Sequence, residues 1–167
     1  ATVQGVTFEL RANYNRKVQL EGGFTLQSSK FDNPVAYIDG LPGIKAFMRT
    51  PNDYGYTILT LTPKNRLRAT FNYVYTGNMQ APHFAGAPNQ SIDEIITTTT
   101  FSEFGTKIGY TLPMKGIDSE IEVYGGVKNL FNAYQDDFDI GKNRDSNFVY
   151  GPGQPRTFFL GLKLKSK

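Results

Sequence analysis

The stretch Arg156-Thr157-Phe158-Phe159-Leu160-Gly161-Leu162-Lys163-Leu164-Lys165 alternates between apolar and polar side chains along most of its length. Neighbouring side chains of a β-strand point to opposite faces, so the segment predicts a strand with one apolar and one polar face. The apolar face holds Phe158, Leu160, Leu162 and Leu164, and the polar face holds Thr157, Lys163 and Lys165. A closing strand of this character is typical of a transmembrane β-barrel, whose last strand pairs with its first and leaves no open edge in lipid.

Upstream of that strand, three short turns each lead into another alternating segment. The turns are expected at 15–17, 63–66 and 113–118, and long connections rich in Pro, Gly, Asn and Asp at 32–53, 77–94 and 132–155. Short turns that alternate strictly with long loops indicate an antiparallel meander whose long loops lie outside the cell. The seven expected strands cover residues 3–14, 18–27, 54–62, 67–76, 95–112, 121–131 and 156–165.

Two of these segments are ambiguous or unusual. Ile58-Leu59 interrupts the alternation in 54–62, so either register of that strand is possible. The segment 95–112 could be a single strand, much longer than the roughly 9–11 tilted residues that cross a bilayer, and its excess would project outward as a β-wall.

The composition excludes several classes of protein. The 167 residues contain no Cys, which excludes a disulfide scaffold or a thiolate metal site. The net charge of +3 is small and scattered, which argues against a nucleic-acid partner. No run approaches the roughly 18 unbroken apolar residues of a membrane helix. Barrel strands alternate and so keep the mean hydropathy low, here −0.39.

The polar faces of the expected strands carry charges of both signs. So many charges on one sheet face require water or mutual pairing, whereas a lipocalin-type interior would be apolar. We therefore expect a water-filled lumen on that side. The expected lumen-facing residues are Glu9, Arg11, Glu21, Arg68, Glu103, Lys107, Glu122 and Lys128.

Aromatic residues lie near both ends of the expected strands and suggest two interfacial girdles, although aromatics are also common in any β core. Tyr14 and Tyr110 lie at turn ends, and the expected members at the loop ends are Phe31, Tyr73, Tyr75 and Phe101.

Seven strands are too few to close a barrel, because about eight is the lower limit. With the last strand running inward, the first also runs inward, which places Ala1 on the outer side. Bacterial barrels have even strand numbers and both termini in the periplasm. We therefore expect further strands upstream and interpret residues 1–167 as one unit, the carboxyl-terminal portion of a larger barrel.

Three motifs resemble TonB-dependent outer-membrane receptors, and together the likeness covers nearly the whole chain. Asn129-Leu130-Phe131-Asn132-Ala133-Tyr134, preceded by Gly126-Val127-Lys128, looks like their penultimate-strand motif, and Tyr150 to Gly161 looks like their closing G-P-x-x-P-R-T-F-F-x-G segment. Arg49-Thr50-Pro51-Asn52-Asp53-Tyr54-Gly55 is similar to an earlier strand entry, and the loop 135–145 resembles receptors from Bacteroides-like bacteria.

The resemblance implies an all-β fold, with these strands as the last seven of a 22-stranded barrel plugged by an amino-terminal domain. It implies localisation in the outer membrane and energy-coupled uptake of a scarce nutrient such as a ferric siderophore, haem, cobalamin or glycan. The implied partners are lipid, the remaining strands and plug of the receptor, and the TonB complex, which a segment outside these residues would engage. One departure is that Ser166 stands where the family usually has a terminal aromatic residue.

The candidate ligand-contacting residues all lie in the expected outer loops. His83 is the sole histidine, and Asp136, Asp137, Asp139 and Arg144 lie in the last loop. Together with Asp145 the aspartates could hold a hard cation, or they could form a solvated acidic loop. Likewise, His83 could contact a ligand or be a plain loop residue.

We expect neither enzymatic activity nor a cofactor. Ser91 and Asp93 lie near His83 in the sequence, but nothing resembles a nucleophile elbow. The alternative function is a non-transporting ligand-binding β-barrel or β-sandwich.

Overall fold

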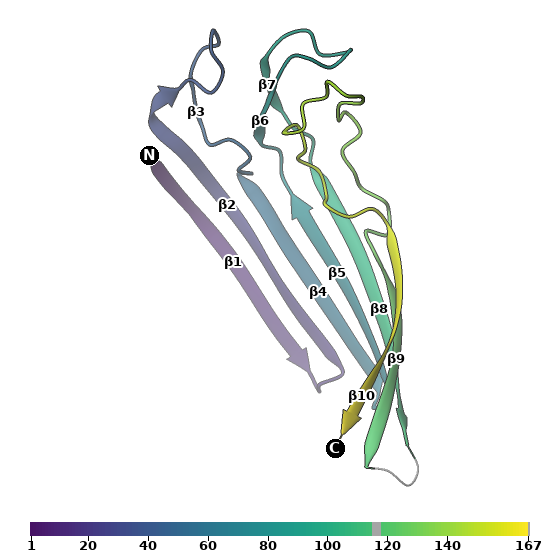
Figure 1. The fold of residues 1–167 in the computed structure, drawn as a ribbon. Helices are drawn as coiled ribbons and strands as arrows, with labels where there is room; N and C mark the ends of the chain where they lie inside the picture. Colours follow the sequence, from purple (N-terminus) through teal and green to yellow (C-terminus); the bar gives the residue numbers. More distant parts are fainter. Residues whose placement is uncertain (115–117, 167) are drawn as a thin grey trace.

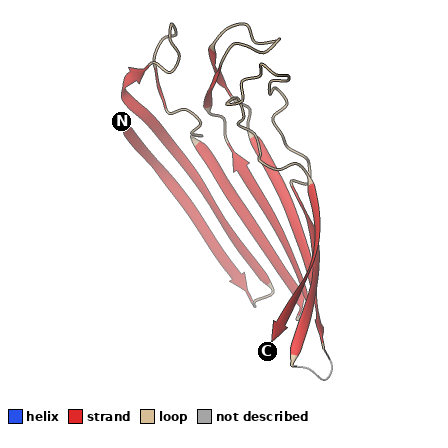
Figure 2. Ribbon diagram, in the orientation of Figure 1, coloured by secondary structure: helices blue, strands red, loops and turns tan. Residues whose placement is uncertain are grey.

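The computed structural model describes residues 1–114 and 118–166, and every regular element in this part is a β-strand. Figures 1 and 2 show one long, curved layer of strands with loops gathered at one end. The ten strands are β1 (Thr2–Tyr14), β2 (Val18–Val35), β3 (Ile44–Ala46), β4 (Asp53–Lys64), β5 (Leu67–Thr76), β6 (Gln80–His83), β7 (Glu94–Thr97), β8 (Phe101–Pro113), β9 (Ser119–Lys128) and β10 (Thr157–Ser166).

Seven of the strands form the expected antiparallel meander. Their order in the sheet is β1-β2-β4-β5-β8-β9-β10, while β3 pairs with β2 and the hairpin β6–β7 forms a separate two-stranded sheet. β1 is paired only with β2 and β10 only with β9, so the sheet is open and does not close into a barrel. In Figure 1 the amino terminus lies at the loop end and the carboxyl terminus at the turn end.

The structure resolves the ambiguous register of β4. Leu59 pairs with Leu20 on one side and with Phe71 on the other, so its side chain lies on the apolar face and Ile58 lies on the charged face. From the sequence alone, it was open which of the two adjacent apolar residues lies on the apolar face. The pairing of β4 with strands on both sides decides this.

Several boundaries differ from the sequence expectation. The expected single strand 95–112 is wrong, because β7 and β8 are separate; between them Thr98 donates its N–H to the Met79 carbonyl at 2.9 Å, and its hydroxyl accepts the N–H of Met79 at 3.1 Å. β2 runs on to Val35, into the expected loop 32–53. Part of the expected turn at 113–118, namely 115–117, lies outside the described residues.

The pairing register gives the sheet one apolar face across all seven strands. The row Ala12, Leu20, Leu59, Phe71, Thr106, Val127 and Phe158 crosses the whole sheet without a charge. Most of this face is uncovered in the described chain, since Phe8 is 64% exposed and Leu160 is 81% exposed. Near the long connection it is partly covered: Val127 is 6% exposed, and Phe131 packs on Phe104 with centroids 5.3 Å apart. Among the described residues no helix is long and apolar enough to cross a membrane.

The eight charged residues assigned to the opposite face do share that face. The register pairs Glu9 with Gly23 and Arg11 with Glu21, and the same parity continues across the sheet. The remaining members are Arg68 on β5, Glu103 and Lys107 on β8, and Glu122 and Lys128 on β9. We refer to this surface as the charged face.

A small core lies at the loop end of the charged face. Phe101, Phe148 and Tyr150 are buried there, with Met79 and Ile96 packed against them. Phe101 shares the charged face with Glu103, because the two residues are two apart on β8. The expectation that Phe101 belongs to an interfacial girdle is therefore wrong: the loops bury it, and it is 6% exposed.

Candidate functional site

Two loop segments meet over this core and form what we call the loop assembly, namely the hairpin β6–β7 and the connection 129–156 (Figure 1). The hairpin places His83 opposite Glu94 next to its connecting loop 84–93, because the two residues are register partners. The long connection then brings the Phe148 ring and the Asp139 carboxylate against the same histidine. The assembly thus gathers titratable side chains from two separate parts of the chain.

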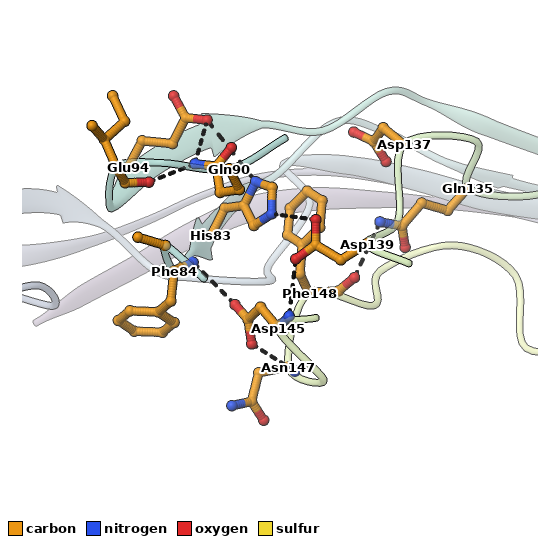
Figure 3. Close-up of polar contacts among 12 residues, drawn as sticks. His83, Phe84, Gln90, Glu94, Gln135, Asp137, Asp139, Asp145, Asn147 and Phe148 are labelled. Carbon is orange, nitrogen blue, oxygen red and sulfur yellow. Dashed lines mark hydrogen bonds and ion pairs between the residues drawn. The ribbon is translucent and has the colours of Figure 1, made fainter. Parts of the chain in front are cut away.

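His83 lies at the centre of the loop assembly. Its ring is stacked on Phe148, with centroids 3.6 Å apart and planes 7° apart. Its Nε2 lies 3.0 Å from a carboxylate oxygen of Asp139, and its Nδ1 lies 3.9 Å from one of Glu94 (Figure 3). The His83 ring is nearly buried, at 7% exposure, so the contact with Asp139 ties the hairpin to the long connection.

Asp139 is also held from its own loop. Its second carboxylate oxygen accepts the backbone N–H of Asp145 at 2.9 Å. This N–H, followed by the contact with His83, holds the pKa of the Asp139 carboxyl below its usual value. Asp145 in turn accepts the N–H groups of Phe84 at 3.0 Å and of Asn147 at 2.8 Å, so a chain of carboxylates caps backbone donors of both segments (Figure 3).

Tyr150 and Gln135 fix the inner part of the long connection. The Tyr150 hydroxyl donates to Asp137 at 2.7 Å, and burial, together with this bond, raises the pKa of the phenol. The buried Gln135 amide accepts the N–H of Tyr150 at 2.9 Å and donates to the carbonyl of Phe148 at 3.2 Å. One side chain therefore satisfies the two backbone groups that flank Val149.

Asn129 closes the base of the long connection. Its amide donates to the carbonyls of Ala133 and Gln154 at 2.8 and 2.9 Å, and its oxygen accepts the N–H of Ala133 at 2.8 Å. Its φ of 48° lies in the left-handed region that Asn tolerates. β9 therefore ends at Lys128, earlier than the expected residue 131.

A third connection, between β3 and β4, joins the loop assembly through Arg49. Its guanidinium donates to the carbonyls of Val149, at 2.8 Å, and Asn147, and its backbone N–H donates to the carbonyl of Gln80 at 2.7 Å. Met48 forms an isolated parallel bridge with Gln80. All three long connections are therefore physically linked.

The loop assembly contains an open groove of about 560 Å³. Its walls combine carboxylates with apolar surface: Glu94, Asp136, Asp137 and Asp139 face it alongside His83, Phe138, Ile140 and Phe148. Opposite charges attract more strongly where water is partly excluded, so a cationic group attached to an apolar body would complement these walls. In the described chain no three His, Asp or Glu side chains are arranged to hold a metal ion.

The structure brings together four of the five predicted loop residues. His83, Asp136, Asp137 and Asp139 line the groove, whereas Arg144 lies outside it and donates to the carbonyl of Gly141 at 3.3 Å. The carboxylate of Asp93 accepts the N–H of Ala85 at 2.7 Å rather than orienting His83. The ring nitrogens of His83 lie against two carboxylates.

Sequence reasoning missed several residues of the assembly. The aromatic platform Phe148, the buried Gln135 and the linking Arg49 lie in connections whose contacts follow no periodicity. Only Glu94 carried a usable signal, because it lies opposite His83 once the short hairpin is drawn.

No protein-family model matches the chain, and no curated protein matches it. Its function is therefore inferred from the two faces of the sheet and from the loop assembly.

Proposed function

We propose that residues 1–167 form the last seven strands of the barrel of a TonB-dependent outer-membrane transporter of about 22 strands. In this proposal the apolar face meets lipid, the charged face lines the lumen, and the loop assembly faces the outside of the cell. The transporter imports a scarce nutrient such as a ferric siderophore, haem, cobalamin or glycan. The observation that carries the membrane assignment is the charge-free face that crosses all seven strands, together with the high exposure of its apolar side chains on β1 and β10.

Exposed apolar surface on this scale requires a covering. Leu160, Leu162 and Leu164 on β10 are 81%, 72% and 69% exposed, and Val6, Phe8 and Leu10 on β1 exceed half exposure. Contiguous apolar patches above a few hundred Å² are rare on soluble monomers, because burying apolar surface is favourable by about 25 cal/mol per Å². Lipid covers such a surface along its whole length without needing shape complementarity.

Aromatic side chains at both ends of the apolar face support this orientation. Tyr14 and Tyr110 lie at the turn end, and they are 70% and 44% exposed. At the loop end Tyr73 packs on Phe104 with centroids 4.6 Å apart, and Tyr75 stacks with Phe24 at 6.2 Å. Tyrosine suits the headgroup region because its ring is apolar and its tip is polar.

The charged face supports a water-filled lumen. Arg11 and Glu21 form an ion pair at 3.0 Å, and their side chains are 81% and 42% exposed. Half-exposed charges of this kind are solvated at little cost in water and at great cost in lipid. This difference supports the proposal that the opposite face meets lipid.

The two open edges support a larger barrel. β1 and β10 each leave one row of backbone donors and acceptors without a strand partner in the described chain. In lipid each unsatisfied group would cost several kcal/mol, so a membrane-spanning sheet must close. Additional strands between β10 and β1 would satisfy both edges.

Spin labelling at adjacent positions tests which face meets lipid. The chain lacks Cys, so single substitutions Phe71→Cys and Leu162→Cys on the apolar face, with Thr70→Cys and Lys163→Cys as matched neighbours, report on each face without background from these residues. In outer membranes containing the full-length protein, we expect the first pair to collide mainly with oxygen and the second mainly with a water-soluble nickel chelate. The reverse result, or equal water exposure of both pairs, would refute the membrane proposal.

Transport is tested separately by uptake. Cells that produce the full-length protein should accumulate one radiolabelled member of a panel of ferric siderophores, haem, cobalamin and glycans, and the accumulation should disappear without TonB. Binding of a panel member with no TonB-dependent accumulation would instead indicate the non-transporting barrel.

A further inference from the structure

A cluster of basic side chains lies on the charged face towards the turn end, away from the loop assembly. Arg68 on β5, Lys107 on β8, and Lys163 and Lys165 on β10 surround a hollow of about 280 Å³. We call these four residues the basic cluster. The loop assembly and its groove do not include any of them.

The basic cluster carries more positive charge than its surroundings neutralise. Glu122 also lines the hollow, and it pairs with Lys165 at 2.7 Å. Glu120 is the register partner of Lys165 on β9. Four cations against these two carboxylates leave an excess of two positive charges, and in the described chain neither Arg68 nor Lys163 has a hydrogen bond or ion pair.

The structure holds part of the cluster in place. The ammonium of Lys107 lies 3.9 Å from the centre of the Tyr124 ring, a cation–π contact that stabilises the charge without cancelling it. Gly109 is the register partner of both Arg68 and Tyr124 and has no side chain of its own, and a carboxylate oxygen of Glu122 lies 2.9 Å from where its Cβ would stand. Lys107 and Lys165 are therefore held beside the hollow, Lys107 by the Tyr124 ring and Lys165 by Glu122.

The width of the cluster selects the kind of partner. From β5 to β10 the cluster crosses three strand spacings, or about 14 Å at about 4.8 Å per spacing. Lys107 and Lys165 are also offset along the strands, because Lys107 lies in the row of Phe159, six residues before Lys165 on β10, or about 20 Å at about 3.3 Å per residue. One phosphate or carboxylate cannot contact all four side chains over this area. A polypeptide segment with two or more carboxylates can, because its residues extend by about 3.3 Å each.

We propose that the basic cluster docks an acidic segment of polypeptide inside the lumen. The contact is electrostatic and partly exposed, so it positions the segment against the wall and is weakened by salt. This inference rests on the proposed function, in which the charged face borders the lumen. It adds the place and the charge of one contact to that picture.

Zero-length carbodiimide cross-linking of the full-length protein in outer membranes tests the proposal. The reagent joins an amine to a carboxylate that touches it, and the Lys165–Glu122 pair serves as an internal positive control. We expect Lys107 and Lys163 to be joined to Asp or Glu residues outside 1–167, with Lys142 in the outer loop 132–155 as a lysine that is not joined to them. Arg68→Lys should add a further cross-link to the same segment.

Charge reversal gives the second arm. Arg68→Glu combined with Lys163→Glu should reduce the Lys107 cross-link to that segment at least tenfold, while the Lys165–Glu122 product persists and shows that the sheet is folded. Cross-links only to Glu120 and Glu122 would overturn the proposal. The proposal would also be overturned if inorganic triphosphate protected Lys163 from acetylation in membranes where no polypeptide is cross-linked to the cluster. The cluster would then be a small-anion site. If either negative result is found while spin labels report that the charged face is exposed to water, the proposal for the basic cluster fails and the transporter proposal stands.

Discussion

His83 lies flat on Phe148, with ring centroids 3.6 Å apart, although the two residues are far apart in the sequence. The stack joins the hairpin β6–β7 to the long connection 129–156, and Asp139 reinforces it from the side. Most of the cohesion of the loop assembly therefore depends on a few side chains. The effects of replacing them are distinct enough to be separated by measurement.

Phe148→Ala should open the loop assembly. Phe148 is 2% exposed and contacts both His83 and Tyr150, so the substitution removes a buried ring and leaves a cavity. We expect this to destabilise the loop assembly by about 3–5 kcal/mol. Amide hydrogen exchange should show lost protection in 132–155 and in β6–β7 but unchanged protection in β4 and β5. Phe138→Ala is the matched control, because Phe138 is 51% exposed. Equal effects of the two substitutions would contradict the assignment of Phe148 as the central platform.

Acid should release the same contact through Asp139. Its folded-state pKa is lowered, so its contribution to stability is present above the ordinary carboxyl value of 3.8 and is lost as the pH falls through the lower folded value. Limited proteolysis should therefore begin to cleave 132–155 only below about pH 4. Asp139→Asn should already be cleaved faster at neutral pH and should lack this acid-induced step. Asp136→Asn, at a residue with no hydrogen bond in the described chain, should keep it.

Tyr150 should show the opposite dependence on pH. Burial and the bond to Asp137 raise its pKa above the ordinary value of 10.0, so its stabilising effect is complete below that value and is lost as the pH rises further. Ultraviolet difference titration of wild type against Tyr150→Phe should show that the tyrosine missing from the variant ionises above the ordinary value of 10.0. Tyr134→Phe is the matched control, because Tyr134 is 57% exposed. A Tyr150 that ionises together with the exposed tyrosines would refute the burial of its hydroxyl.

Asn129→Ala should loosen the base of the long connection. Three hydrogen bonds disappear, each worth about 1 kcal/mol, so we expect a loss of about 2–3 kcal/mol in the local free energy of opening. Hydrogen exchange at Ala133 reports this directly. Asn129→Asp keeps the acceptor and loses both donors, so it should also lower the local free energy of opening. Asn147→Ala is the control, since the Asn147 side chain makes no hydrogen bond in the described chain.

The sheet was far more predictable than the loops, and the reason is periodicity. Strand side chains repeat every two residues, so Glu9, Arg11 and Glu21 could be assigned to one face before their partners were known. The assignment of faces was ambiguous only at Ile58-Leu59, because these two adjacent residues are both apolar. His83 and Asp139 meet across 56 residues through two irregular connections, and no repeat predicts such a contact. Thr98 ends a strand by bonding Met79, which is likewise a tertiary effect.

Thr106→Val should stabilise the sheet. Thr106 lies on the apolar face between Phe71 and Val127, and its hydroxyl is buried without a hydrogen-bond partner in the described chain. Replacing an unsatisfied hydroxyl by a methyl group of similar size removes its desolvation penalty, so we expect a gain of about 1 kcal/mol. The measurement is urea-induced unfolding of the full-length protein in lipid vesicles. Thr106→Ser keeps the hydroxyl and loses the methyl group, so it should give no gain; a valine variant less stable than wild type would show that a neighbour outside this sheet bonds the hydroxyl.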